Sequence, residues 1–551
     1  MKGKNKLFVI GIDGATFDVM RPLLKNGKMP VIKGLMDEGV YGELDSVTNM
    51  ISPSAWTSFM TGKNPGKHGI YEFFEREKNN YNIKFINSKE RRSASIWRML
   101  SDSGFQVGVV NLPMTYPAEK VNGFLIAGLE SPGVEAKGFT YPEGLYDELV
   151  KNCGRYIMEP GVTSHVMAGN LDEAEEILYE SIENRMLTTK YLMNKYNWDI
   201  FMSVFRETDP AQHCFWRFFD KNSPEYTESP YGRGVPNVYC RIDNAIGKIL
   251  EELPQDTSVM VVSDHGFGFR QHGNQCLNNW LEGVGLLRFE DKKRDGFLGL
   301  LYRQIEKRFK RKTKERLARI FPYLRNKVQS KMLFSKIDWG HTKAFADGIR
   351  EGIYINLKGR EPLGIVGETE YEEIRNEIIR LLKETREPYT NELIVEDVFK
   401  REEVYHGDSL FKAPDLIIRW KPDKWIKGML LPSGRIITPY FPTEEHKTIS
   451  GDHRLKGIFI VKGDGIRKGI EIKNSRIIDI TPTILYMMGQ PVPSDMDGKV
   501  ITEIFHNIDA VKWKISQGAA EMDRETDSTM SYDKEEEESV RKRLRDLGYV
   551  E

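Results

Sequence analysis

The feature that most constrains the fold of this chain is a set of short apolar runs that do not alternate with polar residues. The runs are KLFVIGID (6–13), QVGVVNLP (106–113), WDIFMSVFRE (198–207), TSVMVVSDHG (257–266) and GIFIVKGDG (457–465). A strand without alternation is buried on both faces, which is typical of parallel sheets. Stretches of helical periodicity separate the runs, for example residues 170–196. We therefore predict an α/β fold with a doubly wound, mostly parallel central sheet and helices on both faces.

The chain has 551 residues, which is longer than a single hydrophobic core usually becomes, so we expect insertions or a second domain. Residues 1–290 and 401–510 are predicted to form the two parts of the core. Residues 291–400 form a helical or mixed insertion, in which 366–383 has the pattern of a helix. Residues 511–551 form a charged tail that ends in a helix, with Val540, Leu544 and Leu547 on one apolar stripe.

Residues 302–331 of the insertion contain twelve Lys or Arg and two Glu, with apolar residues at helical spacing. The simplest interpretation of this basic helical segment (297–334) is an amphipathic helix whose basic face is solvated. The alternative is peripheral contact with anionic lipid, or with a phosphorylated substrate.

Composition narrows the choice of partner and compartment. The formal net charge of −1 argues against a nucleic-acid polymer as partner. Four widely spaced cysteines without a CxxC pair indicate reduced thiols and a cytoplasmic location. The apolar run at the N-terminus is too short for a signal peptide, and no stretch reaches the roughly 20 apolar residues of a membrane span. The oligomeric state is left open.

Carboxylates follow three of the predicted strands: Asp13, Asp209 and Asp264. The carboxyl ends of the strands form the ligand crevice of such sheets, so we expect these side chains to converge. Each one alone is most simply a helix N-cap, and Asp209 before Pro210 fits that position well. Three together suggest a binding site.

Histidines accompany two of these carboxylates. His213 lies four residues after Asp209, which sets both side chains on one face of a first helical turn, and His265 directly follows Asp264. Carboxylate and imidazole ligands suit a divalent metal. His453 precedes another predicted strand, whereas His68 lacks a carboxylate at useful spacing and is interpreted as structural.

The stretch ISPSAWTSFMTG (51–62) contains a candidate nucleophile. Ser52 precedes Pro53, so we expect it at the cap of a helix that runs to Met60, where the helix dipole favours an incoming phosphate. A plain N-cap is the alternative. Ser54 and Thr57 fall within the helix and are poorer candidates.

In their order, these features resemble the alkaline phosphatase superfamily. The motifs are Asp13 after the first strand, Ser52 nine residues before a Thr-Gly, then TGKNPGKHGI, TDPAQH, SDHGF and DHRLKGIFIVKGDGI. The chain looks most like the type I phosphodiesterase/nucleotide pyrophosphatase branch, especially its microbial phosphohydrolase/phosphomutase-like members. The resemblance covers residues 5–290 and about 405–505.

The resemblance implies an alkaline-phosphatase-like fold and a site for two divalent ions, usually zinc, with manganese also suited to the ligands. It assigns one ion to Asp209, His213 and His453. It assigns the other to Asp13, Asp264 and His265, with Ser52 as a further ligand and as the catalytic nucleophile.

The implied activity is hydrolysis of phosphate mono- or diesters by an in-line, two-metal mechanism through a phosphoserine. Transfer to a phospho-sugar or phospho-acid, as in a phosphomutase, is the enzymatic alternative, and a metal-binding or membrane-surface module is the non-enzymatic one. A sulfatase is excluded, because Ser54 and Trp56 replace the Pro and Arg that its motif needs. Phe73 stands where related nucleotide pyrophosphatases usually have asparagine. Lys67 and Arg206 are candidates for neutralising phosphate charge.

Overall fold

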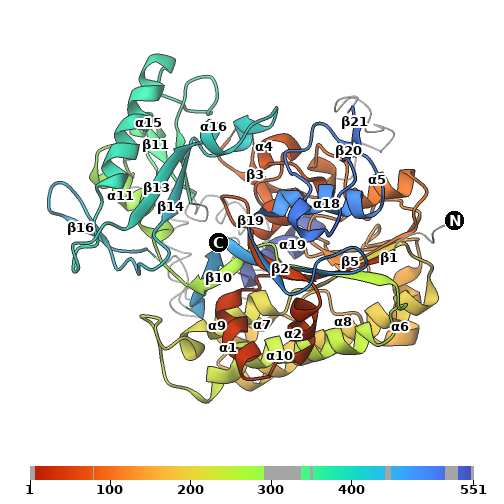
Figure 1. Ribbon diagram of the computed structural model, residues 1–551. Coiled ribbons are helices and arrows are strands. Elements are labelled where there is room, and N and C mark those ends of the chain that lie inside the picture. The colour runs from red at the N-terminus through yellow and green to blue at the C-terminus, as the bar shows by residue number, and fades with distance from the viewer. Residues whose placement is uncertain are drawn as a thin grey trace.

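The computed structural model in Figure 1 describes residues 6–77, 80–290, 337–347, 351–440, 448–515 and 532–547. The predicted basic segment 297–334 lies outside the described residues. The centre of the molecule is a nine-stranded sheet in the order β19–β2–β18–β9–β1–β8–β5–β6–β7.

The five apolar runs all form strands of this sheet: β1 (Lys6–Ile12), β5 (Val107–Leu112), β8 (Ile200–Phe205), β9 (Thr257–Val262) and β18 (Lys456–Lys462). The remaining strands are β2 (Val40–Asp45), β6 (Gly123–Ala127), β7 (Thr140–Tyr141) and β19 (Ile470–Arg476). Strand β1 pairs in parallel with β8 and β9, and β5 pairs in parallel with β6 and β8. The mostly parallel central sheet is confirmed.

The predicted parallel direction is wrong for β18, which runs antiparallel to both β9 and β2. Residues 457–461 are nevertheless buried without alternation. Helices cover both faces of the sheet, so the missing alternation reports burial on two sides and carries no information on strand direction.

The covering helices form two layers (Figure 1). One layer contains α5 (Ile96–Asp102) and α18 (Ile480–Met487), which both contact α3 (Ser52–Thr61). The other contains α1 (Phe17–Lys25), α2 (Pro30–Asp37), α8 (Leu171–Lys195) and α10 (Gly234–Leu250). Helix α8 matches the helix predicted over 170–196. Apolar side chains of both layers and of the sheet belong to one hydrophobic cluster.

A second apolar cluster lies outside the main core, at the upper left of Figure 1. It is built on a four-stranded antiparallel sheet and on α15 (Glu368–Lys383), the helix predicted over 366–383. The strands are β11 (Ala344–Phe345), β12 (Gly352–Ile355), β14 (Leu416–Trp420) and β13 (Val395–Lys400). Buried residues of this cluster run from Cys276 to Ile437. The division of the chain at 290 and 400 stays a prediction.

The tail ends in α19 (Lys534–Asp546), in agreement with the predicted terminal helix. Val540, Leu544 and Leu547 are buried in the main core, as their common stripe predicts. All four cysteines are free, with Cys214 and Cys276 buried. Among the described helices, none combines the length and the apolar character needed to cross a membrane.

Candidate metal centre and nucleophile

The three predicted carboxylates lie beyond the carboxyl ends of three neighbouring strands in the middle of the sheet. Asp13 follows β1, Asp264 follows β9, and Asp209 lies in the first turn of α9 (Thr208–Phe219), which follows β8. All three side chains are fully buried. Because β8, β1 and β9 are adjacent, the parallel order of the sheet brings together residues that are far apart in the sequence.

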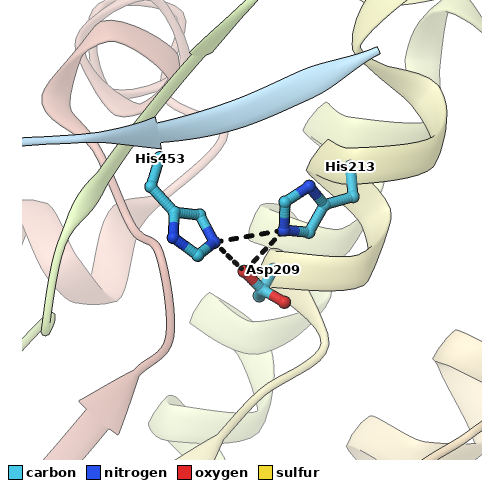
Figure 2. Close-up of side chains that lie close together, drawn as sticks. All are labelled: Asp209, His213 and His453. Carbon is cyan, nitrogen blue, oxygen red and sulfur yellow. Dashed lines mark hydrogen bonds and ion pairs between the residues drawn. The ribbon is translucent and has the colours of Figure 1, made fainter. Parts of the chain in front are cut away.

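The first group contains Asp209 and His213 of α9 and His453 of β17 (Gly451–Arg454), as Figure 2 shows. Asp209 Oδ1 lies 3.4 Å from His213 Nε2 and 3.3 Å from His453 Nε2. The two Nε2 atoms are 3.1 Å apart. The arrangement directs one carboxylate oxygen and two imidazole nitrogens at a common point.

The second group contains Asp13, Asp264 and His265. His265 Nε2 lies 3.3 Å from Asp264 Oδ2 and 3.6 Å from Asp13 Oδ1. The ring of His265 stacks on that of His453 with centroids 3.8 Å apart, so the two groups are neighbours. Within each group the ligand atoms lie within 4.8 Å of one another, so each could hold a metal ion.

Backbone carbonyls orient the three histidines. His213 Nδ1 lies 2.9 Å from the carbonyl oxygen of Gly451, His453 Nδ1 lies 2.8 Å from that of Met50, and His265 Nδ1 lies 3.0 Å from that of Gly266. A carbonyl oxygen only accepts hydrogen bonds, so each Nδ1 carries the proton and donates it. Nε2 of each ring is then the atom directed at the carboxylates, and it is the atom through which each histidine could ligate a metal.

The carboxylate of Asp209 attracts both imidazoles of the first group strongly. Burial by itself raises the pKa of Asp209, but the imidazoles of His213 and His453 outweigh it and hold the pKa well below its usual value. Burial opposes a charge on His453 as well, yet Asp209 raises the pKa of that imidazole to about 9. Apart from the contacts of Oδ1 with these two imidazoles, neither carboxylate oxygen of Asp209 has a hydrogen-bond partner among the described residues.

The second group is short of positive charge. Burial raises the pKa of Asp13 to about 6, and burial together with the neighbouring Asp13 raises that of Asp264 well above its usual value. Apart from its contact with His265 Nε2, Asp264 Oδ2 has no hydrogen-bond partner in the described part of the chain. Buried carboxylate oxygens without donors are costly, and a divalent cation with O/N ligands would satisfy them. The residues present therefore fit a metal in each group.

Ser52 is the first residue of α3, and Ile51 occupies the N-cap. The predicted cap position is therefore wrong by one residue, and the helix ends at Thr61 instead of Met60. The cause is the direction of the hydroxyl: Ser52 Oγ lies 3.2 Å from His265 Nε2 and 3.4 Å from Asp13 Oδ1. It therefore faces the second group.

Helix α9 likewise begins earlier than predicted. Glu207 is its N-cap and Asp209 its second residue, so Asp209 is not the cap that the sequence suggested. The helix starts at Thr208, whose hydroxyl donates to the backbone carbonyl of Asp13. The predicted common face of Asp209 and His213 is confirmed by their contact.

Three further residues from the sequence belong to neither group. His68 Nε2 contacts Ser58 Oγ at 2.8 Å, and burial lowers the pKa of His68 to about 3, which favours a neutral imidazole. Its structural role stays a prediction. Lys67 Nζ is paired with Asp497 Oδ1 at 2.5 Å. Phe73 is buried in the main core and offers no side-chain donor.

Two contacts to Asp13 were not predicted. Arg206 Nε donates to Asp13 Oδ2 at 3.2 Å, and Trp56 Nε1 donates to the same oxygen at 3.4 Å. Both side chains are buried. In the sequence, the only feature that could have predicted the contact of Arg206 is its position directly after an apolar strand. Trp56 has the pattern of an ordinary core residue of α3.

Comparison with known proteins identifies the relatives of this chain. The sequence profile of the type I phosphodiesterase / nucleotide pyrophosphatase family matches residues 7–453. Phosphonoacetate hydrolase from Sinorhizobium meliloti 1021 has a similar fold, with a TM-score of 0.50 and 14% identity over 88% of this chain and 95% of that one. Human ectonucleotide pyrophosphatase/phosphodiesterase 5 superposes with a TM-score of 0.49 and 12% identity over 91% of this chain and 100% of that one.

A search of curated proteins finds no match. The profile match spans most of the chain and includes every residue of both groups and Ser52. The chain belongs to the type I phosphodiesterase/nucleotide pyrophosphatase family, and it is a hydrolase of phosphoric ester bonds.

Proposed function

We propose that the protein is a two-metal phosphohydrolase in which Ser52 is the nucleophile. The observation that carries this proposal is the position of Ser52 Oγ between His265 Nε2 and Asp13 Oδ1, at 3.2 and 3.4 Å. A hydroxyl at the start of a helix, directed at two candidate metal ligands, is poorly explained as a structural group.

Asp209, His213 and His453 would hold one ion, and Asp13, Asp264 and His265 the other, with zinc the first choice and manganese the second. Divalent ions bound there would lower the pKa of a coordinated hydroxyl and neutralise charge on phosphoryl oxygens. The Nδ1–H bonds from the three histidines to backbone carbonyls hold the rings in the orientation that ligation needs.

The chain's own part in the reaction begins with Ser52. Its Oγ forms a bond to phosphorus while the bond from phosphorus to the ester oxygen breaks on the opposite side, and the alcohol leaves after its oxygen takes up a proton that balances the one lost by Ser52. Water then attacks the phosphorus of the serine ester and breaks the Oγ–P bond. One proton of the water restores the Ser52 hydroxyl, and its oxygen leaves with phosphate or a phosphate monoester. The positive end of the α3 dipole at Ser52 favours the negatively charged group throughout.

The substrate is proposed to be a small phosphate mono- or diester. Phe73 cannot supply the amide that related nucleotide pyrophosphatases place at this position, so we do not restrict the substrate to nucleotides. The four free cysteines fit a reducing compartment, which supports the cytoplasm as the proposed location.

The test compares Ser52→Ala with Ser54→Ala. Ser54 is a matched control because its hydroxyl is equally buried, belongs to the same helical turn and has no hydrogen-bond partner among the described residues. Each protein is stripped of metal and refilled with zinc or manganese, and hydrolysis of p-nitrophenyl phosphate and bis-p-nitrophenyl phosphate is measured.

We expect metal-dependent turnover that falls by at least about 10³-fold in Ser52→Ala and changes little in Ser54→Ala, because a nucleophile has no substitute in the same position. The ratio of the two rates identifies the preferred ester class. Full activity of Ser52→Ala would rule out Ser52 as the nucleophile. Phosphoryl transfer to an added phospho-sugar or phospho-acid without net hydrolysis would instead establish a mutase.

A further inference from the structure

The carboxylate of Asp13 has two sides with different surroundings. Oδ1 faces Ser52 Oγ at 3.4 Å and His265 Nε2 at 3.6 Å. Oδ2 accepts hydrogen bonds from Arg206 Nε at 3.2 Å and from Trp56 Nε1 at 3.4 Å. One oxygen is therefore directed at the candidate metal group and the nucleophile, and the other is occupied by two donors of the protein.

Arg206 also contacts the first group. Its Nη2 lies 4.0 Å from Asp209 Oδ2, so one guanidinium spans carboxylates that belong to different groups. Arg206 is buried, and its planar fork cannot be reproduced by a lysine ammonium.

The turn that carries Arg206 is tied to Asp13 through the backbone as well. Asp13 N donates to the Phe205 carbonyl at 2.9 Å, and the Thr208 hydroxyl donates to the Asp13 carbonyl. The segment 205–209 therefore holds the main chain and the side chain of Asp13, and it also supplies Asp209.

From these contacts we infer that Arg206 and Trp56 are positioning residues, which hold Asp13 with Oδ1 toward the metal and Ser52, and that Arg206 couples the two metal groups. The inference rests on the proposed two-metal site and assigns Arg206 a role different from direct neutralisation of substrate phosphate. Donors to a ligating carboxylate commonly change metal affinity or activity by 10–100-fold when they are removed.

The experiment measures metal binding directly. Metal-free wild type, Arg206→Met, Arg206→Lys and Trp56→Phe are titrated with Zn²⁺ by calorimetry, and the visible absorption spectrum of each Co²⁺-loaded protein is recorded. Trp56→Phe keeps an aromatic ring against Phe59, whose centroid lies 5.6 Å away, and removes the indole N–H. Trp280→Phe is the matched control, since Trp280 is fully buried in the second apolar cluster and its Nε1 has no partner among the described residues.

We expect Arg206→Met to bind Zn²⁺ about 10- to 100-fold more weakly and with an altered Co²⁺ spectrum, Arg206→Lys to recover only part of the loss, and Trp56→Phe to show a smaller effect. Trp280→Phe should bind zinc as wild type does. A purely structural role would lower the Tm of the metal-free protein without changing the spectrum of the loaded one.

Two results would overturn the inference in different ways. Unchanged zinc affinity and spectrum in Arg206→Met, with only KM raised, would make Arg206 a substrate contact. A wild type that binds no zinc would remove the proposed function and this role together. Activity retained in Ser52→Ala would remove only the proposed nucleophile, and weaker zinc binding by Arg206→Met would still support the positioning role.

Discussion

At the scale of single residues, the candidate site depends on which nitrogen of each histidine carries the proton. Gly451, Met50 and Gly266 offer only carbonyl oxygens to His213, His453 and His265, so Nε2 is left for a ligand. The partners of the three Nδ1 atoms are backbone carbonyl oxygens. The sequence identifies the three histidines by the residues next to them, but the backbone contacts determine which ring nitrogen is available to a metal.

His213→Gln tests this arrangement. Replacing a ring whose Nε2 is directed at Asp209 should remove the ion of the first group, because an amide is a poor substitute for imidazole. We expect elemental analysis to find one zinc per chain in place of two, with turnover reduced by at least about 10²-fold. His68→Gln is the control, since His68 is also buried but contacts Ser58, and it should retain both ions. Two zinc ions in His213→Gln would exclude His213 as a ligand.

At the scale of elements, apolar periodicity was a good guide to where helices and strands occur and a poorer guide to how they begin. Helix α3 starts one residue and α9 two residues earlier than predicted, and the hydroxyls of Ser52 and Thr208 contact Asp13. These contacts join segments that are distant in the sequence, so a local capping rule does not predict them.

Helix α19 lies outside the family motifs, yet it packs against the main core. Its apolar stripe is buried in the main core, and Arg543 donates to the carbonyls of Leu129 at 3.0 Å and Pro132 at 3.1 Å in the loop after β6. We expect Leu544→Ala to lower the free energy that protects α19 from opening by about 2–4 kcal/mol, because a fully buried side chain is truncated.

Hydrogen exchange of the α19 backbone amides measures that free energy. Lys542→Ala, at an exposed position of the same helix, should change it by less than about 0.5 kcal/mol. Equal protection in Leu544→Ala and wild type would mean that the stripe contributes little to docking.

At the scale of the whole molecule, Asp497 joins three distant parts of the chain. Its carboxylate pairs with Lys67 Nζ at 2.5 Å, accepts from Asn64 N at 2.8 Å and lies 2.9 Å from His406 Nε2. Burial opposes its charge, but the hydrogen bonds from Lys67 and Asn64 prevail and lower the pKa from 3.8 to about 2. The neighbouring Tyr405 belongs to a small apolar cluster with Tyr71, so this ion pair lies where the segments around 70 and 405 meet.

This shift predicts the sign of an acid effect. A carboxyl whose pKa is lower in the folded state stabilises the fold above its ordinary pKa, and that contribution is lost as the pH falls from about 4 to about 2. Asp497→Asn should therefore lower stability by about 1–3 kcal/mol at pH 7, and it should make stability less dependent on pH between 4 and 2. Thermal unfolding at several pH values measures both effects, with the exposed Asp464→Asn as control. Parallel pH profiles for Asp497→Asn and wild type would show that Asp497 does not contribute in this way.

The sequence by itself determined the fold class, the positions of the buried strands and the chemical types in the site, because burial and ligand chemistry leave local signals such as unbroken apolar runs and Asp/His pairs. The tertiary structure alone decided the antiparallel direction of β18, the carbonyl partners of the histidines and the contact of Arg206 with Asp13. Each of these joins segments distant in the chain, 193 positions apart for Arg206 and Asp13. No local pattern of residues records such a pairing, because the geometry that produces it exists only once the sheet has formed.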